Sequence, residues 1–324
     1  MSTPLRLGIS SCLLGERVRW NGGHERRAFL ADVLAPHVQW VAACPEMEAG
    51  LGAPREAIAF VRGEGGLVLL GATSRRDLSQ TVVTAVRARL DALAGARLDG
   101  YVLKSRSPSC GLSGARVYET PEDLFSDGPF ERAAQGVFAA ALVRGLPWLP
   151  VVEETDLDAR EGREHFVERC FAMRRARERL RAAAASADVA DFHDRHDLQI
   201  LARSAEARRS LGELLAGGQP SSSDVAAAYA AGFAEAMARP PSRDRIAGVL
   251  RRIENRLIAR LPSPERGEIA GAITAYEANG AELDDVREVL LEAAAMVADE
   301  VLVRQTFLAV DPGERALRAL LRAA

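Results

Sequence analysis

The sequence predicts an α/β protein, with an open, mostly parallel sheet and flanking helices, followed by an all-α helical domain. Up to about residue 153, short apolar runs typical of strands alternate with amphipathic runs. Beyond that point strand-like runs almost vanish, and the remainder is rich in Ala, Arg, Glu and Leu. Alternating strands and helices are typical of parallel sheets, and successive amphipathic runs are typical of helical domains. We therefore expect two domains, residues 1–155 and 156–324.

Apolar runs place the elements of the first domain. We expect strands at residues 5–11 and 38–43, with a helix at residues 25–34 between them. Runs at residues 57–61 and 67–70 enclose a glycine-rich turn and predict a β-hairpin. The later elements are a helix from its N-cap Asp77 to Leu93, a buried strand at 101–103, a helix at 130–143, and a last strand at 146–152 whose prolines place it at an edge.

The second domain is predicted to consist of helices. Their expected ranges are 163–185, 188–215, 223–238, 243–261, 264–279 and 284–308. Arginines cluster at residues 169–181 and again at 239–260. Such clusters either neutralise phosphates or form solvated helix faces with ion pairs four residues apart, and the pattern leaves both interpretations open.

Composition excludes several classes of protein. The 324 residues are 48% hydrophobic and 27% charged, which allows a full core and argues against wholesale disorder. No run approaches the ~18–20 apolar residues of a membrane span. The sequence starts without a signal-peptide layout, and its four cysteines are widely and irregularly spaced. This pattern predicts reduced thiols and a cytoplasmic protein.

Three cysteines follow predicted strands. Cys12 and Cys44 end the first two apolar runs, and Cys110 lies in the loop after residues 101–103. Because the carboxyl ends of parallel strands meet at one edge of a sheet, we expect the three thiols to converge there. Buried thiols that only fill space are common, so the pattern alone leaves packing and metal binding open. If they bind metal, a set of three leaves one coordination position unfilled, which suggests catalysis or an iron–sulfur cluster with one free iron.

Other polar residues accompany these cysteines. Glu46 lies two residues after Cys44. It is either a proton shuttle or a loop carboxylate that accepts hydrogen bonds from backbone amides. Ser107 and Ser109 either orient a substrate or water, or form ordinary turns. Lys104 is the single lysine among 42 Lys and Arg residues, which suggests a position that needs a compact charge.

Cysteine and histidine in the second domain have simpler interpretations. Cys170 is expected to be a packing residue, because His165, five residues away, lies on a different helix face. His193 and His196 share a face, but the sequence sets no carboxylate or cysteine group around them. We expect both histidines at the helix surface or in capping positions rather than as metal ligands.

The three cysteine segments resemble the thiouracil desulfidase (TudS-like) family. The resemblance rests on residues 10–15 with 18–20, on Cys44-Pro45-Glu46, on residues 104–111 and on residues 136–140. It implies a 4Fe–4S cluster held by Cys12, Cys44 and Cys110, with the fourth iron free to take the substrate sulfur. It also implies a role for Glu46 and for one serine, with Ser107 preferred to Ser109.

The second half resembles the helical domain fused to this module in tRNA 4-thiouridine desulfidases. The matching segments are residues 195–198, 202–204 and 305–308. Where that domain usually has Thr-Arg-Lys-Arg-His, this chain has Pro-Ser-Arg-Asp-Arg at residues 241–245. The resemblance implies that the helical domain binds RNA and that the partner is a thiolated nucleobase, nucleoside or tRNA, with no DNA or membrane partner.

The chemistry expected from this resemblance is hydrolytic and needs no net redox change. Water activated by Glu46 adds to the ring carbon, and sulfur leaves as hydrosulfide. Lys104 and Ser107 orient the ring or stabilise developing charge. Two alternatives remain: a zinc-binding module without catalysis whose helical half binds RNA or protein, and a desulfidase restricted to free thiouracil.

Overall fold

The computed structural model describes residues 3–181, 186–217 and 222–323. The chain divides into two compact units, Met1–Phe171 with Ala316–Ala324, and Ala172–Arg315. This division falls within one long helix, α5 (Arg160–Arg181). The domain limits expected from the sequence, 1–155 and 156–324, therefore stay a prediction. None of the helices in the described parts of the chain combines the length and the hydrophobicity that crossing a bilayer requires.

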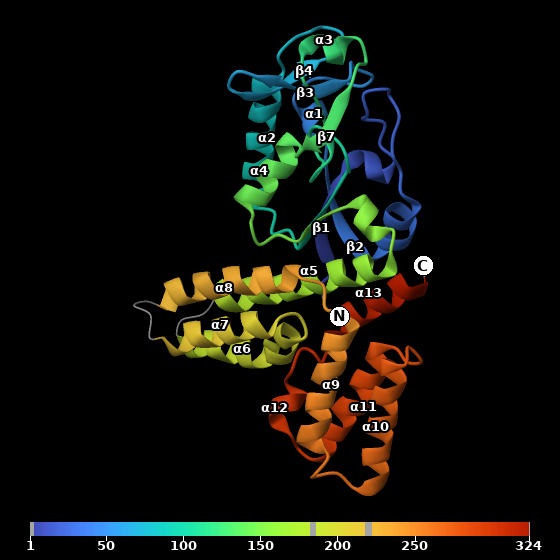
Figure 1. Cartoon of the computed structure of the whole chain (residues 1–324), viewed down its shortest axis with the longest axis vertical. Helices are drawn as coiled ribbons and strands as arrows, with labels where there is room; N and C mark the ends of the chain where they lie inside the picture. Colours follow the sequence, from blue (N-terminus) through green and yellow to red (C-terminus); the bar gives the residue numbers. More distant parts are fainter. Residues whose placement is uncertain (1–2, 182–185, 218–221, 324) are drawn as a thin grey trace. The chain divides into compact units, whose positions relative to one another are not determined.

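The first unit contains a four-stranded parallel sheet in the order β2-β1-β5-β8 (Figure 1). Its strands are β1 (Leu5–Ser10), β2 (Val38–Ala43), β5 (Gly100–Leu103) and β8 (Val151–Glu153). Most of their apolar residues are buried, and those of β2 are partly buried, as expected for a parallel sheet covered on both faces. The predicted fold class, a mostly parallel sheet followed by helices, is confirmed. β8 lies at an edge of the sheet as expected, but it begins only at Val151, so the first part of the strand expected at residues 146–152 is wrong and both prolines precede β8.

A second, mixed sheet has the order β4-β3-β6-β7. The expected hairpin is present as β3 (Ile58–Gly63) and β4 (Gly66–Gly71), which pair antiparallel. The sequence did not predict β6 (Ala115–Tyr118) and β7 (Phe130–Ala134), which also pair antiparallel.

The predicted helix at residues 130–143 is wrong in its first half. Strand β7 occupies it, and α4 (Val137–Gly145) begins only after Gly136. Cross-strand contacts override the helical pattern: Phe130 packs on Tyr118, and the guanidinium of Arg116 lies over the Phe130 ring.

Helices cover both faces of the parallel sheet. On one face, α2 (Ser79–Ala94) and α4 pack against residues of β5. On the other face, β1 packs against the start of α5, the helical turn Phe29–Leu34 and the end of α13 (Pro312–Ala323). Only this turn forms within the helix expected at 25–34. Asp77 lies just before the N-cap position of α2, which Leu78 occupies, and its Oδ1 accepts a hydrogen bond from Ser79 N.

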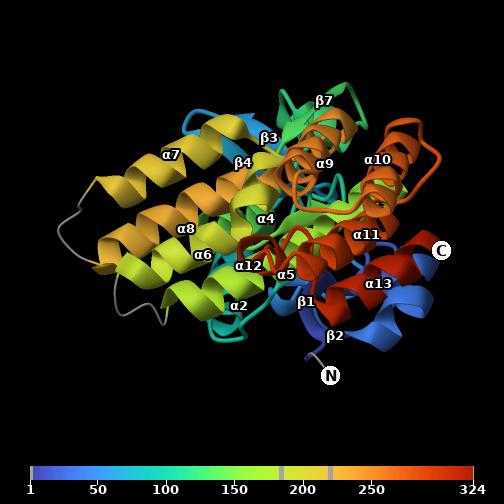
Figure 2. The ribbon, with the colours of Figure 1, turned by 90° about the horizontal axis from the view of Figure 1, so that it is seen from below.

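The second unit is helical over its described residues. After the end of α5, helices α6 (Ser186–Leu201), α7 (Ala205–Ala216) and α8 (Ser222–Ala238) lie side by side (Figures 1 and 2). Next come α9 (Arg243–Leu257), α10 (Ser263–Glu277), α11 (Leu283–Met296) and the short α12 (Glu300–Val303).

Two long helices expected in this unit are each divided. Ser204, whose hydroxyl accepts from Ala207 N, caps α7 and separates it from α6. Asp299 caps α12 in the same way through Leu302 N. The side-chain oxygens of both residues accept hydrogen bonds from backbone amides, so these residues favour the start of a helix over its interior. Residues 182–185, the end of the first expected helix, lie outside the described residues.

Candidate functional site

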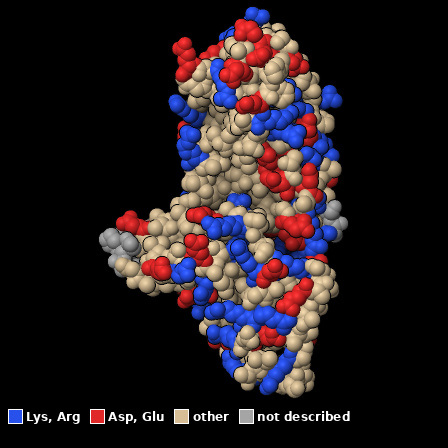
Figure 3. Space-filling model, viewed as in Figure 1, with Lys and Arg blue, Asp and Glu red and all other residues tan. Residues whose placement is uncertain are grey.

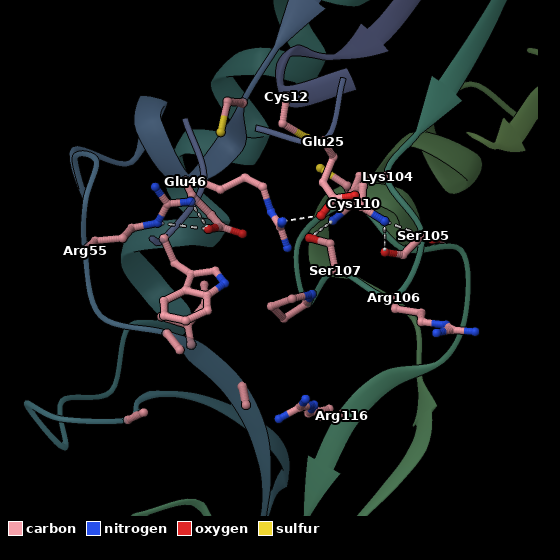
Figure 4. A pocket seen from close by; sticks show the side chains of 18 of the residues that line it. Cys12, Glu25, Glu46, Arg55, Lys104, Ser105, Arg106, Ser107, Cys110 and Arg116 are labelled. Carbon is pink, nitrogen blue, oxygen red and sulfur yellow. Dashed lines mark hydrogen bonds and ion pairs between the residues drawn. The ribbon is translucent and has the colours of Figure 1, made fainter. Parts of the chain in front are cut away.

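Three thiols that are distant in the sequence line one cavity of about 750 Å³ in the first unit (Figure 4). Cys12 lies in the helical turn Ser11–Leu14 after β1, and Cys44 directly follows β2. Cys110 lies in the loop between β5 and β6. These three strands are adjacent and parallel, so their carboxyl ends open into the same space.

All three thiols have a pKa above the ordinary value of 9.0. Burial and the negative charge of Cys44 raise the pKa of Cys12 to about 12. Burial also raises the pKa of Cys110, as do Glu46 and the other two thiols, and burial raises the pKa of Cys44. Metal ligation by these thiols would therefore release protons. In the described residues, no group of three or more His, Cys, Asp or Glu side chains is arranged to hold a single metal ion. The cysteines of a 4Fe–4S cluster each bind a different iron.

Glu46 lies in the same cavity with both carboxylate oxygens hydrogen-bonded. It follows Cys44 in the short helix α1 (Pro45–Glu48), and 12% of its side chain is exposed. Its Oε1 accepts a hydrogen bond of 2.7 Å from the hydroxyl of Ser109. Its Oε2 accepts from Nε of Arg55 at 3.0 Å and forms an ion pair with Nη2 of the same side chain. The carboxylate is thus fixed beside the thiols, but still accessible from the cavity.

The two serines occupy different positions. The Ser107 oxygen lines the cavity and accepts backbone hydrogen bonds from Ser109 N at 3.2 Å and Cys110 N at 3.0 Å. Ser109 is fully buried and contacts Glu46. In Figure 4, Ser107 and Cys110 lie across the opening from Glu46 and Arg55. Nothing in the residues of this loop indicates that the two serine hydroxyls face different neighbours.

The start of α4 supports this serine loop. Phe138 N donates to Ser109 O at 2.8 Å, and Gly136 N donates to Gly111 O at 2.8 Å. A Cβ atom on Gly136 would lie 2.5 Å from Ser109 O, so only glycine allows the two segments to approach so closely. The segment at residues 136–140 therefore shapes the loop that presents Cys110.

Lys104 is held by a buried carboxylate that the sequence interpretation missed. Its Nζ donates to Glu154 Oε1 at 2.7 Å, and to the carbonyl and hydroxyl oxygens of Ser105. Burial alone would raise the pKa of Glu154, but hydrogen bonds from Lys104 and Ser105, together with the lysine charge, outweigh burial and lower it. Glu154 directly follows β8, so the reasoning that placed the cysteines at strand ends also applies to it.

Parts of this chain are similar to known proteins. Residues 7–154 match the model of a family described as 2-thiouracil desulfurase. The chain is 32% identical over 108 residues to an uncharacterised protein, YbbK, of Bacillus subtilis (strain 168); the match covers 32% of this chain and 71% of YbbK. The chain belongs to the 2-thiouracil desulfurase family.

Two further matches accompany that result. Residues 198–312 match a family described only as a protein of unknown function, DUF1722. A solved structure of a 4Fe-4S-dependent thiouracil desulfidase, TudS, is 28% identical in sequence, with a TM-score of 0.39. That match covers 48% of this chain and 93% of the TudS chain.

Cys170 is separate from the desulfurase-family cavity. It is fully buried in the core formed by α5, α13 and the parallel sheet. A Cβ atom on Gly100 would lie 2.6 Å from its sulfur, so the thiol packs tightly against β5. This position agrees with a packing role.

The two histidines of α6 are not surface groups, which corrects the expectation from the sequence. His196 is buried, stacks on Phe192, and its Nδ1 lies 2.7 Å from Phe192 O. Its Nε2 accepts from Arg175 Nε at 3.3 Å. Nδ1 of His193 lies 3.0 Å from the hydroxyl of Tyr229, a residue of α8. Neighbouring helices cover both rings, and helical spacing within α6 alone does not reveal this.

Burial of His196 predicts an acid-sensitive helical unit. Burial and the charge of Arg175 lower the pKa of His196 from 6.5 to about 3. Below pH 6.5 the imidazole therefore binds a proton in the unfolded chain but not in the folded chain. The free energy of unfolding falls as the pH is lowered from 6.5 towards 3. Urea unfolding should show that wild type loses about 2 kcal/mol more than His196→Phe between pH 7 and pH 5. Equal losses in both proteins would contradict this assignment.

Two of the three matching segments of the helical half, residues 195–198 and 305–308, contact each other. Gln305 accepts from Leu198 N at 3.1 Å and donates to the carbonyl of Asp194, so its amide inserts into the backbone of α6. Thr306 N donates to Arg195 O at 2.8 Å. These contacts hold the chain after α12 against α6, which gives residues 195–198 and 305–308 a structural role.

Many arginines of the second cluster are engaged within the helical unit. They bind carboxylates of Glu235, Glu254, Glu277 and Asp299, and carbonyls of Arg203 and Tyr276. On the face in Figure 3, basic and acidic side chains are interspersed over this part of the chain. The arrangement agrees with paired helix faces, and RNA binding by this unit stays a proposal.

Proposed function

We propose that the chain is a non-redox, hydrolytic desulfidase that removes sulfur from a thiolated pyrimidine, with 4-thiouridine in tRNA as its substrate. The observation that carries the proposal is that Cys12, Cys44 and Cys110 share a cavity with Glu46. The family match over residues 7–154 supports the same reaction class. Reduced thiols agree with a cytoplasmic location.

The donor set fits a 4Fe–4S cluster. The three thiols follow three adjacent strands, and among the described residues that line the cavity there is no fourth cysteine. We propose that Cys12, Cys44 and Cys110 each hold one iron. When bound, such a cluster supplies an iron with an open position, a soft Lewis acid suited to a thiocarbonyl sulfur.

Glu46 lies where its carboxylate can accept a proton from a water molecule in the cavity. In our proposal its Oε1 takes a proton from a water molecule as the water oxygen bonds to the ring carbon. The C–S bond then breaks, and the overall reaction converts C=S and water into C=O and hydrogen sulfide, without a change of oxidation state. The Ser109 hydroxyl, 2.7 Å from Oε1, keeps this oxygen in place.

The remaining cavity walls suit a planar ring with a phosphorylated end. Trp20 lines the cavity with 49% of its surface exposed, and an indole offers a stacking face for a pyrimidine. Arg106, Arg116 and Arg132 also line the cavity, and they would face a phosphate of a nucleotide or tRNA. We propose that Ser107 contacts the ring and that Lys104 acts through the loop it holds, because Ser105 and Glu154 occupy its ammonium.

A comparison of substrates tests this function. The anaerobically purified chain is incubated with 4-thiouridine-containing tRNA, with 4-thiouridine and with 2-thiouracil, and sulfide release is measured. We expect more sulfide to be released from the tRNA than from either smaller substrate. Release from the free base alone would restrict the enzyme to thiouracil, and absence of sulfide from every substrate would contradict the proposed function.

A further inference from the structure

One arginine outside the three cysteine segments connects several walls of the cavity. Arg55 has 6% of its side chain exposed, and it contacts three other residues that line the cavity, Glu46, Val18 and Trp20. Nε and Nη2 engage Oε2 of Glu46. Nη1 donates to the carbonyls of Val18 at 2.9 Å and Gly52 at 2.6 Å, and the backbone N donates to Trp20 O at 2.8 Å.

These contacts hold the carboxylate and the loop at residues 18–20 as one unit. The thiol of Cys44 also reaches the Val18 carbonyl, at 3.9 Å, so this loop lies directly beside the candidate ligand set. Because Arg55 engages Oε2, the other oxygen of Glu46 is the one directed to Ser109 and available for proton transfer. A lysine could not replace Arg55, since a single ammonium lacks the planar fork that reaches several acceptors at once.

We propose that Arg55 is a positioning residue for the desulfuration reaction: it orients Glu46 and fixes the loop that carries Trp20. The proposal rests on the function proposed above. Arg55 acts through these neighbours and does not take part in the bond changes. Misplacing a reacting group by about 1 Å costs about 10²-fold in rate, so loss of Arg55 should mainly lower kcat.

The chain contains a matched control for this arginine. Arg89 forms a bidentate pair with Glu48, two residues after Glu46 on the same helix, with distances of 2.7 and 2.6 Å. Arg89 does not belong to the cavity lining. Arg89→Ala therefore removes the same kind of ion pair from the same helix, while Glu48 can still accept its hydrogen bond of 3.2 Å from Cys44 N.

The experiment compares wild type, Arg55→Ala, Arg55→Lys and Arg89→Ala as iron-loaded full chains. For both Arg55 variants we expect kcat to fall about 10²-fold with KM changed only a few-fold and iron content unchanged. Added guanidinium should restore part of the kcat of Arg55→Ala, and Arg89→Ala should resemble wild type.

Three results would overturn the assignment of Arg55. These are activity in the Arg55 variants equal to that of Arg89→Ala, loss of bound iron from both Arg55 variants, or a kcat that guanidinium leaves unchanged. The wild-type assay separates this test from that of the function. An inactive wild type would remove the proposed desulfidase function, whereas an active wild type with unaffected Arg55 variants would remove only the role of Arg55.

Discussion

Glu46→Gln is expected to lower kcat by about 10²–10⁴-fold while iron content stays at the wild-type level. The amide keeps the size of the side chain and can still accept from Ser109, but it cannot take a proton from water. Steady-state sulfide release, measured beside the visible absorption of the same sample, checks the prediction.

Glu25 provides the control for this variant. It is a second carboxylate of the cavity, and it forms an ion pair with Arg19. Glu25→Gln should retain activity within a few-fold of wild type. If Glu46→Gln instead retains full activity with its iron bound, Glu46 has no part in the chemistry, and another group must activate the water.

Replacing any one of Cys12, Cys44 and Cys110 with alanine is expected to abolish both iron binding and sulfide release. Three ligands already leave one iron open, so a further loss leaves the cluster with two protein attachments. Iron and acid-labile sulfide should be measured per chain after anaerobic purification, together with activity.

Cys170→Ala is the matched control for the three ligand variants. Cys170 is buried even more deeply than Cys110, but packs against β5 in the core rather than at the cavity. This variant should keep its iron, its activity and its visible absorption. A loss of iron in Cys170→Ala equal to that in Cys12→Ala would show that general destabilisation, not ligand removal, explains the result.

The sequence predicts the parallel sheet well because its strands are short and predominantly apolar, although the exposed Arg6 and Gln39 interrupt β1 and β2. From that sheet, the shared location of Cys12, Cys44 and Cys110 follows by topology alone. The same reasoning would have found Glu154, which follows the last strand. Strand β7 was missed because its residues Phe130–Ala134 are mostly exposed, and pairing with β6 rather than hydrophobic periodicity stabilises it.

Interactions between loops are harder to predict. Nothing in the residues near Arg55 indicates that its guanidinium reaches both Glu46 and the carbonyl of Val18, because the backbone path after Gly50 determines that geometry. Likewise, the burial of His196 depends on Arg175 and Phe233, which come from other helices. Side-chain periodicity describes one element at a time and carries no information about such partners.

The most direct test of the account is the metal content of the anaerobically purified wild-type chain. A three-cysteine cluster site predicts a brown protein with broad visible absorption and with iron and acid-labile sulfide in equal amounts. A colourless protein that contains zinc, or one that binds no metal after reconstitution with iron and sulfide, would contradict it.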